Sequence, residues 1–165
     1  MGDRNYISTT AGLLAEVLYR QDRIQESAEL AGVCRDLASA DDVASQFLWR
    51  CVQAKLLARD GQREEADAIL TEALELIGRS DLVDWQGNGF VDLAEVCRLG
   101  GRTAEAVEAL GQASLRFAAK GNVVSLRRAD ELAGKLRGAL KDTAPNSPQS
   151  AALPVTSPER SPAET

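Results

Sequence analysis

The chain has 165 residues, of which 44% are hydrophobic and only 4% aromatic, and its formal net charge is −6. This acidic balance argues against a general nucleic-acid binder, which needs a basic face to neutralise phosphates. Histidine is absent, which removes the usual zinc ligand, the commonest general base and every histidine-based catalytic triad. No apolar run approaches the roughly 20 residues of a membrane span, and no charged-then-apolar leader opens the chain, so we expect a cytoplasmic protein.

Seven segments with the apolar spacing of helices follow one another along the first 140 residues. We expect Ser8 or Thr9 to cap the first helix, because short polar side chains accept hydrogen bonds from free backbone N–H groups. The predicted helices are residues 8–20, 24–38, 43–59, 63–78, 83–99, 103–119 and 122–140.

A turn motif recurs between these segments as "DRIQES", "GQREEA" and "GRTAEA", with spacings of 39 and 40 residues. Asp22, Gly61 and Gly101 open the three copies, where a left-handed backbone conformation can end a helix. A fixed period in this range predicts stacked helix pairs. The predicted units are approximately residues 8–40, 41–80 and 81–120, followed by a capping helix at 122–140.

The second helix of each unit carries small residues at i, i+4 and i+7, which lie on one face of a helix. Small side chains on this face would let the paired helix approach closely. The three sets are Ser27, Ala31 and Cys34; Ala66, Leu70 and Ala73; and Ala106, Leu110 and Ala113.

The composition changes after Lys141. Residues 142–165 hold all five prolines of the chain and have no periodic apolar face. Such a segment cannot bury enough apolar surface to offset its ordering entropy, so we expect a disordered tail after a repeat domain at residues 1–141.

These features resemble the tetratricopeptide repeat, with a small residue at the turn side of the second helix and a glycine at the turn. The period of 39–40 residues and the missing proline at the end of each repeat favour the longer, MalT-like variety. The resemblance implies an all-α, right-handed solenoid of three helix pairs plus a C-terminal capping helix. The residues that carry it are Ala15, Leu18 and Ser27; Ala54, Leu57 and Ala66; and Ala94, Cys97 and Ala106.

A longer resemblance covers roughly residues 2–140. The stretches "GDRNYISTTAGLLAEVLYRQ", "DDVASQFLWRCVQAKLLARDG" and "KGNVVSLRRA" are similar to the C-terminal repeat region of bacterial multidomain nucleotidyl cyclase/ATPase signalling proteins. It implies a non-catalytic protein–protein interaction or scaffolding module of bacterial signalling type. No GxxxxGK[ST] phosphate loop is present, so no catalytic residue carries over.

The residues that could take part in catalysis or ligand binding are better explained by structural roles. The adjacent carboxylates of Glu64–Glu65 and Asp130–Glu131 fall on polar helix faces, and "WQGNGF" at 85–90 lacks a preceding strand and the GxGxxG spacing. Three cysteines lie inside apolar helical patterns without a CxxC motif, which indicates reduced, buried thiols. We expect no enzyme activity, no cofactor and no bound metal.

The first helices of the units predict a partner-binding groove. In tetratricopeptide-like stacks one side of each first helix lines a concave surface. One interpretation is that Lys55, Arg59, Arg20 and Arg98 form a basic strip there that binds a protein or peptide through an acidic segment or a free C-terminal carboxylate. The competing interpretation is that these side chains pair with Glu16 and Glu95 and stay solvated. The predicted groove residues are Glu16, Tyr19, Arg20, Lys55, Arg59, Asn88, Glu95 and Arg98.

Two alternative functions are open at this stage. The chain could be a detached C-terminal fragment of a larger cyclase/ATPase regulator, without independent activity. A bare N-terminal face around Leu13 and Leu14 would then favour self-association. It could also be a sensor module for a small ligand. We expect neither nucleic acid nor membrane as a partner.

Overall fold

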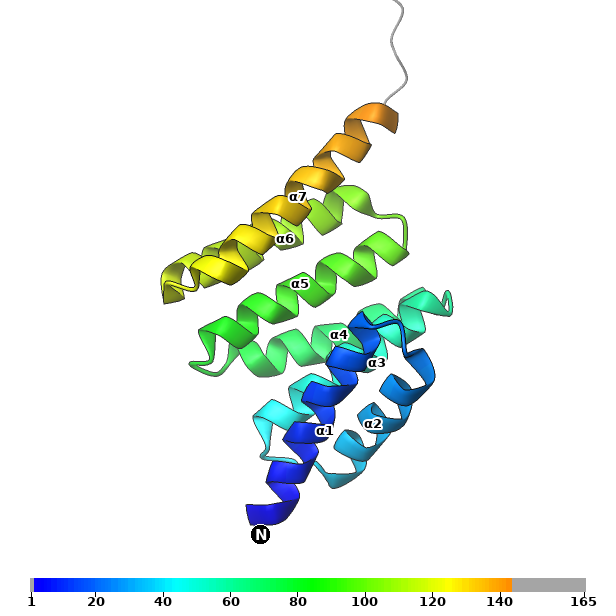
Figure 1. The fold of residues 1–165 in the computed structure, drawn as a ribbon, viewed down its shortest axis with the longest axis vertical. Coiled ribbons are helices and arrows are strands. Elements are labelled where there is room, and N and C mark those ends of the chain that lie inside the picture. Colours follow the sequence, from blue (N-terminus) through cyan, green and yellow to red (C-terminus); the bar gives the residue numbers. More distant parts are fainter. Residues whose placement is uncertain (1, 144–165) are drawn as a thin grey trace, which may run out of the picture.

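The computed structural model describes the backbone of residues 2–143 and the side chains of residues 6–142. Within these residues the protein is all-α and contains no strand, as the sequence predicts (Figure 1). The elements are α1 (Gly2–Arg20), α2 (Ile24–Leu37), α3 (Val43–Arg59), α4 (Arg63–Gly78), α5 (Val83–Leu99), α6 (Thr103–Lys120) and α7 (Val123–Thr143).

The helices stack as successive hairpins, α1 with α2, α3 with α4 and α5 with α6. The first helices of neighbouring hairpins also pack directly, α1 on α3 and α3 on α5. The last helix, α7, packs on α6 at the opposite end of the stack from α1 (Figure 1). The helical repeat is therefore confirmed, whereas the right-handed solenoid of tetratricopeptide type stays a prediction.

The same turn closes each hairpin. Asp22, Gly61 and Gly101 have φ angles of 60°, 81° and 76°, the left-handed conformation predicted for them. The residue that follows Asp22, Gly61 or Gly101 donates its backbone N–H to the carbonyl five positions before it in the chain. In the second hairpin, for example, Gln62 N lies 2.9 Å from Leu57 O. The chain reversal is thus repeated with the same hydrogen bond in three units.

The small residues of the second helices lie in the core, as predicted. All nine are at most 2% exposed. In the first unit the Ser27 hydroxyl donates a hydrogen bond of 2.8 Å to the Ala15 carbonyl on the facing helix. The equivalent positions, Ala66 and Ala106, are completely buried. Each hairpin therefore closes on a side chain no larger than serine.

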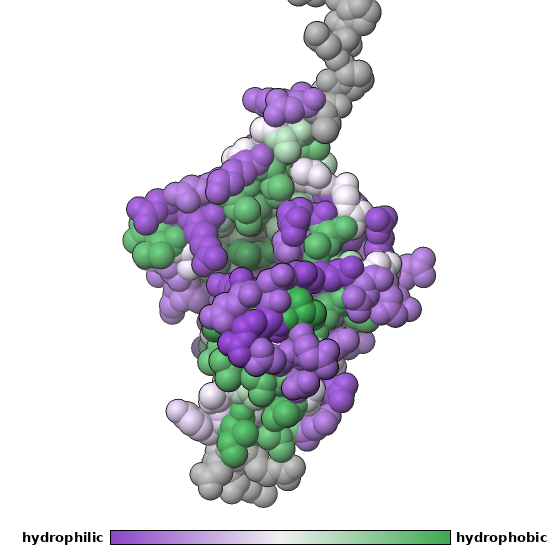
Figure 2. Space-filling view, turned by 45° about the vertical axis from the view of Figure 1, so that its right-hand side comes forward, coloured by the Kyte–Doolittle hydropathy of each residue, from purple (hydrophilic) through white to green (hydrophobic). Residues whose placement is uncertain are grey.

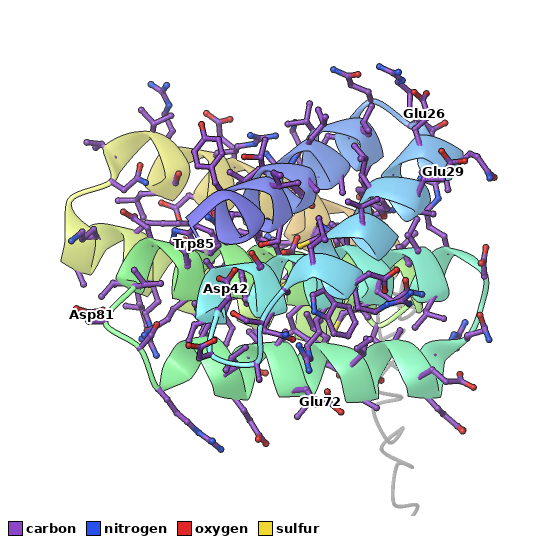
Figure 3. All side chains as sticks on the ribbon, turned by 90° about the horizontal axis from the view of Figure 1, so that it is seen from below. Glu26, Glu29, Asp42, Glu72, Asp81 and Trp85 are labelled. Atoms are coloured by element: carbon purple, nitrogen blue, oxygen red, sulfur yellow. The ribbon has the colours of Figure 1, made fainter. Side chains whose placement is uncertain are left out.

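Two glycines of α5 allow large side chains of other helices to approach its backbone. A Cβ at Gly87 would lie 2.6 Å from Cε1 of Phe117, and one at Gly89 would lie 2.8 Å from Cδ2 of Leu74. Trp85, labelled in Figure 3, lies on the same helix with its ring centroid 5.8 Å from that of Phe47. The "WQGNGF" stretch is therefore a helix-packing segment.

The helix ends differ from the prediction by more than one residue at two places. Because α1 begins at Gly2, Ser8 and Thr9 lie inside it and cannot cap it; the buried Ser8 hydroxyl instead lies 2.8 Å from the Ser45 hydroxyl of α3. At the other end α7 runs to Thr143, so Asp142 and Thr143 of the predicted tail are helical. The remainder of that tail, 144–165, lies outside the described residues.

Three further predictions concern cysteines, carboxylates and membrane spans. Cys34, Cys51 and Cys97 are free and buried, and burial raises the pKa of the Cys34 thiol to about 11. The carboxylates at 64–65 and 130–131 lie on exposed helix faces. No helix in residues 2–143 has the length and apolar character needed to span a bilayer.

Candidate functional site: a cleft between α5 and α7

A cleft opens because α7 departs from the packing of the other first helices. Whereas α3 and α5 each pack on the preceding first helix, α7 packs on α6 instead. Ala129 and Ala133 form this contact and are each 3% exposed, with Leu126 and Leu136 partly buried beside them. The space left on the α5 side of α7 is a cleft of about 450 Å³.

The bottom of the cleft is apolar. Leu110 and Phe117 reach it from α6 and are almost completely buried, while Val91 of α5 and Leu132 of α7 line its sides. Figure 2 shows this apolar surface in a hollow bordered by polar side chains. Such a surface can bind an apolar side chain of a ligand.

A buried ionic cluster forms the wall of the cleft on the side of α1 and α3. The Lys55 side chain is only 2% exposed, and its Nζ donates to the Glu16 carboxylate and, at 2.6 Å, to Oδ1 of Asp92. Arg20 donates from Nε to Glu16 at 2.7 Å. The Lys55 Nζ also lies 4.9 Å from the centroid of the Tyr19 ring. One lysine therefore joins α1, α3 and α5.

The electrostatics of the cluster follow from its burial. Burial alone would lower the pKa of Lys55, but the carboxylates of Asp92 and Glu16 outweigh it and the net pKa is raised, so Lys55 stays charged. Burial raises the pKa of the Asp92 carboxyl, an effect that Lys55 offsets only in part. Burial and the nearby Glu95 raise the pKa of Tyr19 to about 12, so its hydroxyl stays protonated and donates to Glu95 at 3.3 Å.

Seven of the eight predicted groove residues line this cleft. They are Glu16, Tyr19, Arg20, Lys55, Arg59, Asn88 and Glu95. The exception is Arg98, which does not line the cleft and instead donates two hydrogen bonds of 2.8 Å to Glu95. Whether these residues bind a partner stays a prediction.

The predicted basic strip is wrong. Lys55 is buried because α3 is the middle one of the three packed first helices, so this position faces neighbours on both sides. Arg59 donates to Asp22 at 2.8 Å, and Arg20 is paired with Glu16. These cations are neutralised within the protein and do not offer free charge to an acidic partner.

Two residues important to the cleft were missed, Asp92 and Arg128. A signal for Asp92 was available: at the repeat spacing it occupies the position of Val52 and Leu13, so a carboxylate replaces an apolar residue. Arg128, on α7, had a signal too: at the repeat spacing of 40 residues it corresponds to Asn88, a predicted groove residue, but the sequence analysis treated α7 only as a capping helix. Arg128 is exposed, and it is the one cationic side chain of the described cleft lining without a carboxylate partner among residues 6–142.

Many acidic side chains lie on the outside of the stack, away from the cleft. Figure 3 shows Glu26 and Glu29 projecting outward from α2 and Glu72 from α4. Within the part of the chain that the structure describes, no group of three or more histidine, cysteine or carboxylate side chains is arranged to hold a metal ion. Among the described residues, the cleft itself combines an apolar floor with Arg128 as its one unpaired cationic side chain.

Comparisons with known proteins do not assign the chain to a family. No protein-family model matches the chain, and no match is found among curated proteins. A solved structure described as the crystal structure of BtubC (BKLC) from P. vanneervenii is similar, with 16% sequence identity, a TM-score of 0.47 and coverage of 94% of this chain and 72% of that chain. A similarity at this level supports no conclusion about function.

Proposed function

We propose that the protein is a non-catalytic interaction module of bacterial signalling type, and that the cleft between α5 and α7 binds a segment of a partner protein. The observation that carries the proposal is the combination of an apolar floor, made by Leu110 and Phe117, with a free arginine at the rim. A segment with an apolar side chain next to a carboxylate matches this surface. The apolar side chain would cover the floor, and the carboxylate would accept hydrogen bonds from Arg128.

The cluster at Lys55 serves as a rigid wall in this proposal. Its charges are satisfied by Glu16 and Asp92, so it need not be broken when a partner binds. Asn88 is exposed on the α5 side and can hydrogen-bond to the backbone of an extended segment. Affinity then comes from apolar contact at the floor, and preference for an acidic segment comes from Arg128.

The test uses short peptides of defined chemistry. Peptides selected from a displayed random library against residues 1–165 should be enriched in an apolar residue beside aspartate, glutamate or a free C-terminus. The substitution Arg128→Glu should weaken their binding at least tenfold by fluorescence anisotropy, a loss of about 1.4 kcal/mol or more. Binding to the unmodified protein should weaken with added salt.

A matched control is available on the same helix. Arg127 is exposed, lies 3.9 Å from Glu131 and does not line the cleft. Arg127→Glu makes the same charge change beside the site and should leave binding within about twofold. Failure to select any acidic–apolar peptide, or equal losses in the two variants, would reject the proposal.

A small-ligand sensor is a second candidate, favoured by the size of the cleft. Its volume of about 450 Å³ falls within the usual range of roughly 300–1,000 Å³ for small-molecule sites. A small apolar carboxylate should then raise the melting temperature of the protein, and Arg128→Glu should abolish the rise. If no carboxylate of a panel raises the melting temperature while peptides bind tightly, the sensor is rejected and the interaction module is retained.

A further inference from the structure

A bare apolar face runs along α1. Tyr6, Ile7, Leu13, Leu14 and Val17 are between 46% and 77% exposed and lie on one side of the helix. Figure 2 shows this apolar surface at the lower end of the molecule, over α1. None of these residues lines the cleft.

The equivalent positions of the next repeat unit indicate what kind of surface would contact this face. At the repeat spacing Leu13 corresponds to Val52 of α3, and Val17 corresponds to Leu56. Val52 and Leu56 are 1% and 7% exposed because the preceding helix pair covers them, whereas Leu13 and Val17 are 48% and 47% exposed. The bare face therefore has the side chains of a helix–helix contact without the second helix.

The spacing along the face suits a second copy of the same helix. Tyr6, Thr10, Leu13 and Val17 follow the alternating four- and three-residue steps of a helix-pairing seam. Thr10 fits such a seam because its hydroxyl donates to the Tyr6 carbonyl of its own helix at 2.7 Å, which satisfies the hydroxyl locally. The pattern is symmetric about the point between residues 11 and 12.

We infer that two copies of the chain associate through α1, with the two helices antiparallel about a twofold axis. In this arrangement Tyr6 of each copy contacts Val17 of the other, and Thr10 contacts Leu13. The chain cannot cover the face with α7, because that helix lies at the opposite end of the described stack (Figure 1). Because the same patch meets itself, the association closes at two copies.

The area predicts a weak dimer. The five apolar side chains expose roughly 450 Å² per copy, or roughly 900 Å² for the pair, which is below the standard size of a stable interface. Interfaces of this size are weak and transient, so we expect a dissociation constant of about 1 µM or higher. The dimer should therefore form only over a range of protein concentration that sedimentation can follow.

The experiment measures mass by sedimentation velocity from about 1 µM to about 300 µM of residues 1–165. The unmodified protein should change from monomer to dimer across this range, without larger species. Leu13→Glu should stay monomeric throughout while keeping the helical circular dichroism of the unmodified protein. A matched control, Leu115→Glu, changes a leucine that is 60% exposed on α6 and should dimerise normally.

The antiparallel register has its own test that does not depend on the stability of one variant. Thr10→Lys alone should also weaken the dimer. An equimolar mixture of Leu13→Glu and Thr10→Lys should associate at least tenfold more tightly than either alone, because glutamate of one copy then faces lysine of the other. A protein that is monomeric up to the highest concentration overturns the inference, and so does a dimer that Leu13→Glu leaves intact. A dimer without rescue in the mixture overturns the antiparallel register.

Discussion

Replacing Lys55 by methionine removes the charge at the centre of the ionic cluster but keeps a long apolar side chain. The Asp92 side chain is 12% exposed and receives a 2.6 Å hydrogen bond from the Lys55 ammonium. In the variant this carboxylate would be buried without its counter-charge. Removing one partner of a buried pair costs about 3–5 kcal/mol, and we expect the lower end, about 3 kcal/mol, because Arg20 still pairs with Glu16.

The loss should be visible as a fall in both denaturation midpoint and melting temperature. A cost of about 3 kcal/mol corresponds to a fall of roughly 6–12 °C for a protein of this size. Urea unfolding followed by far-ultraviolet circular dichroism gives the free-energy difference directly. Lys135, exposed on α7, provides the control: Lys135→Met should change the stability by less than about 0.5 kcal/mol.

The effect of pH has a definite sign. Burial already raises the pKa of Asp92, and loss of Lys55 should raise it further. A carboxyl whose pKa is higher in the folded than in the unfolded state stabilises the fold when protonated, and that contribution is lost as pH rises through the folded pKa. The deficit of Lys55→Met should therefore be smaller near about pH 4.5 than at about pH 7.

A second substitution separates loss of charge balance from loss of packing. In Lys55→Met combined with Asp92→Leu, no uncompensated carboxylate remains at the second position, and most of the lost stability should return. A single variant within about 1 kcal/mol of the unmodified protein would refute the reasoning. A double variant no more stable than the single variant would refute it equally.

Two further predictions concern packing. Gly87→Ala should lower the free energy of unfolding by about 1–3 kcal/mol in urea, because the new methyl group would lie 2.6 Å from a Phe117 ring carbon. Gly111→Ala is the control: no atom lies within 4 Å of its new methyl group, so it should be neutral or stabilising by up to about 1 kcal/mol. Equal effects of the two substitutions would contradict the packing seen at α5. The buried thiols of Cys34 and Cys51 should react with a disulfide reagent only as fast as the protein opens, so that labelling becomes rapid in urea; rapid labelling of the native protein would contradict their burial and raised pKa values.

The sequence predicted the helices and turns better than the pairing of the charged side chains, for a physical reason. Apolar periodicity and left-handed turn residues act over a few neighbouring positions, so Asp22, Gly61 and Gly101 could be located from the chain alone. The beginning of α1 was missed because the Ser8 hydroxyl resembles a cap in sequence, yet it bonds to Ser45 on another helix.

The candidate site was predicted in part. The repeat register brought most of the predicted groove residues to one cleft, but it treated Lys55 as an exposed residue of a single helix. The contact of α3 with helices on both sides buries that position, and only tertiary packing reveals it. The repeat spacing relates Arg128 to Asn88, so its place in the cleft could have been predicted. Its lack of a carboxylate partner among residues 6–142 depends on how α7 packs on α6, which the repeat spacing does not encode.

The ionic cluster also favours one order of the helix pairs. Glu16, Lys55 and Glu95 hold the same position in three successive units, so the sign of the charge alternates along the stack. Lys55 is attracted to the carboxylates on both sides of it. If the middle unit were deleted, Glu16 and Glu95 would become neighbours, and two carboxylates would repel each other at the junction. The units are therefore not interchangeable copies, and a chain that lost or exchanged one by recombination would carry the electrostatic penalty at that junction.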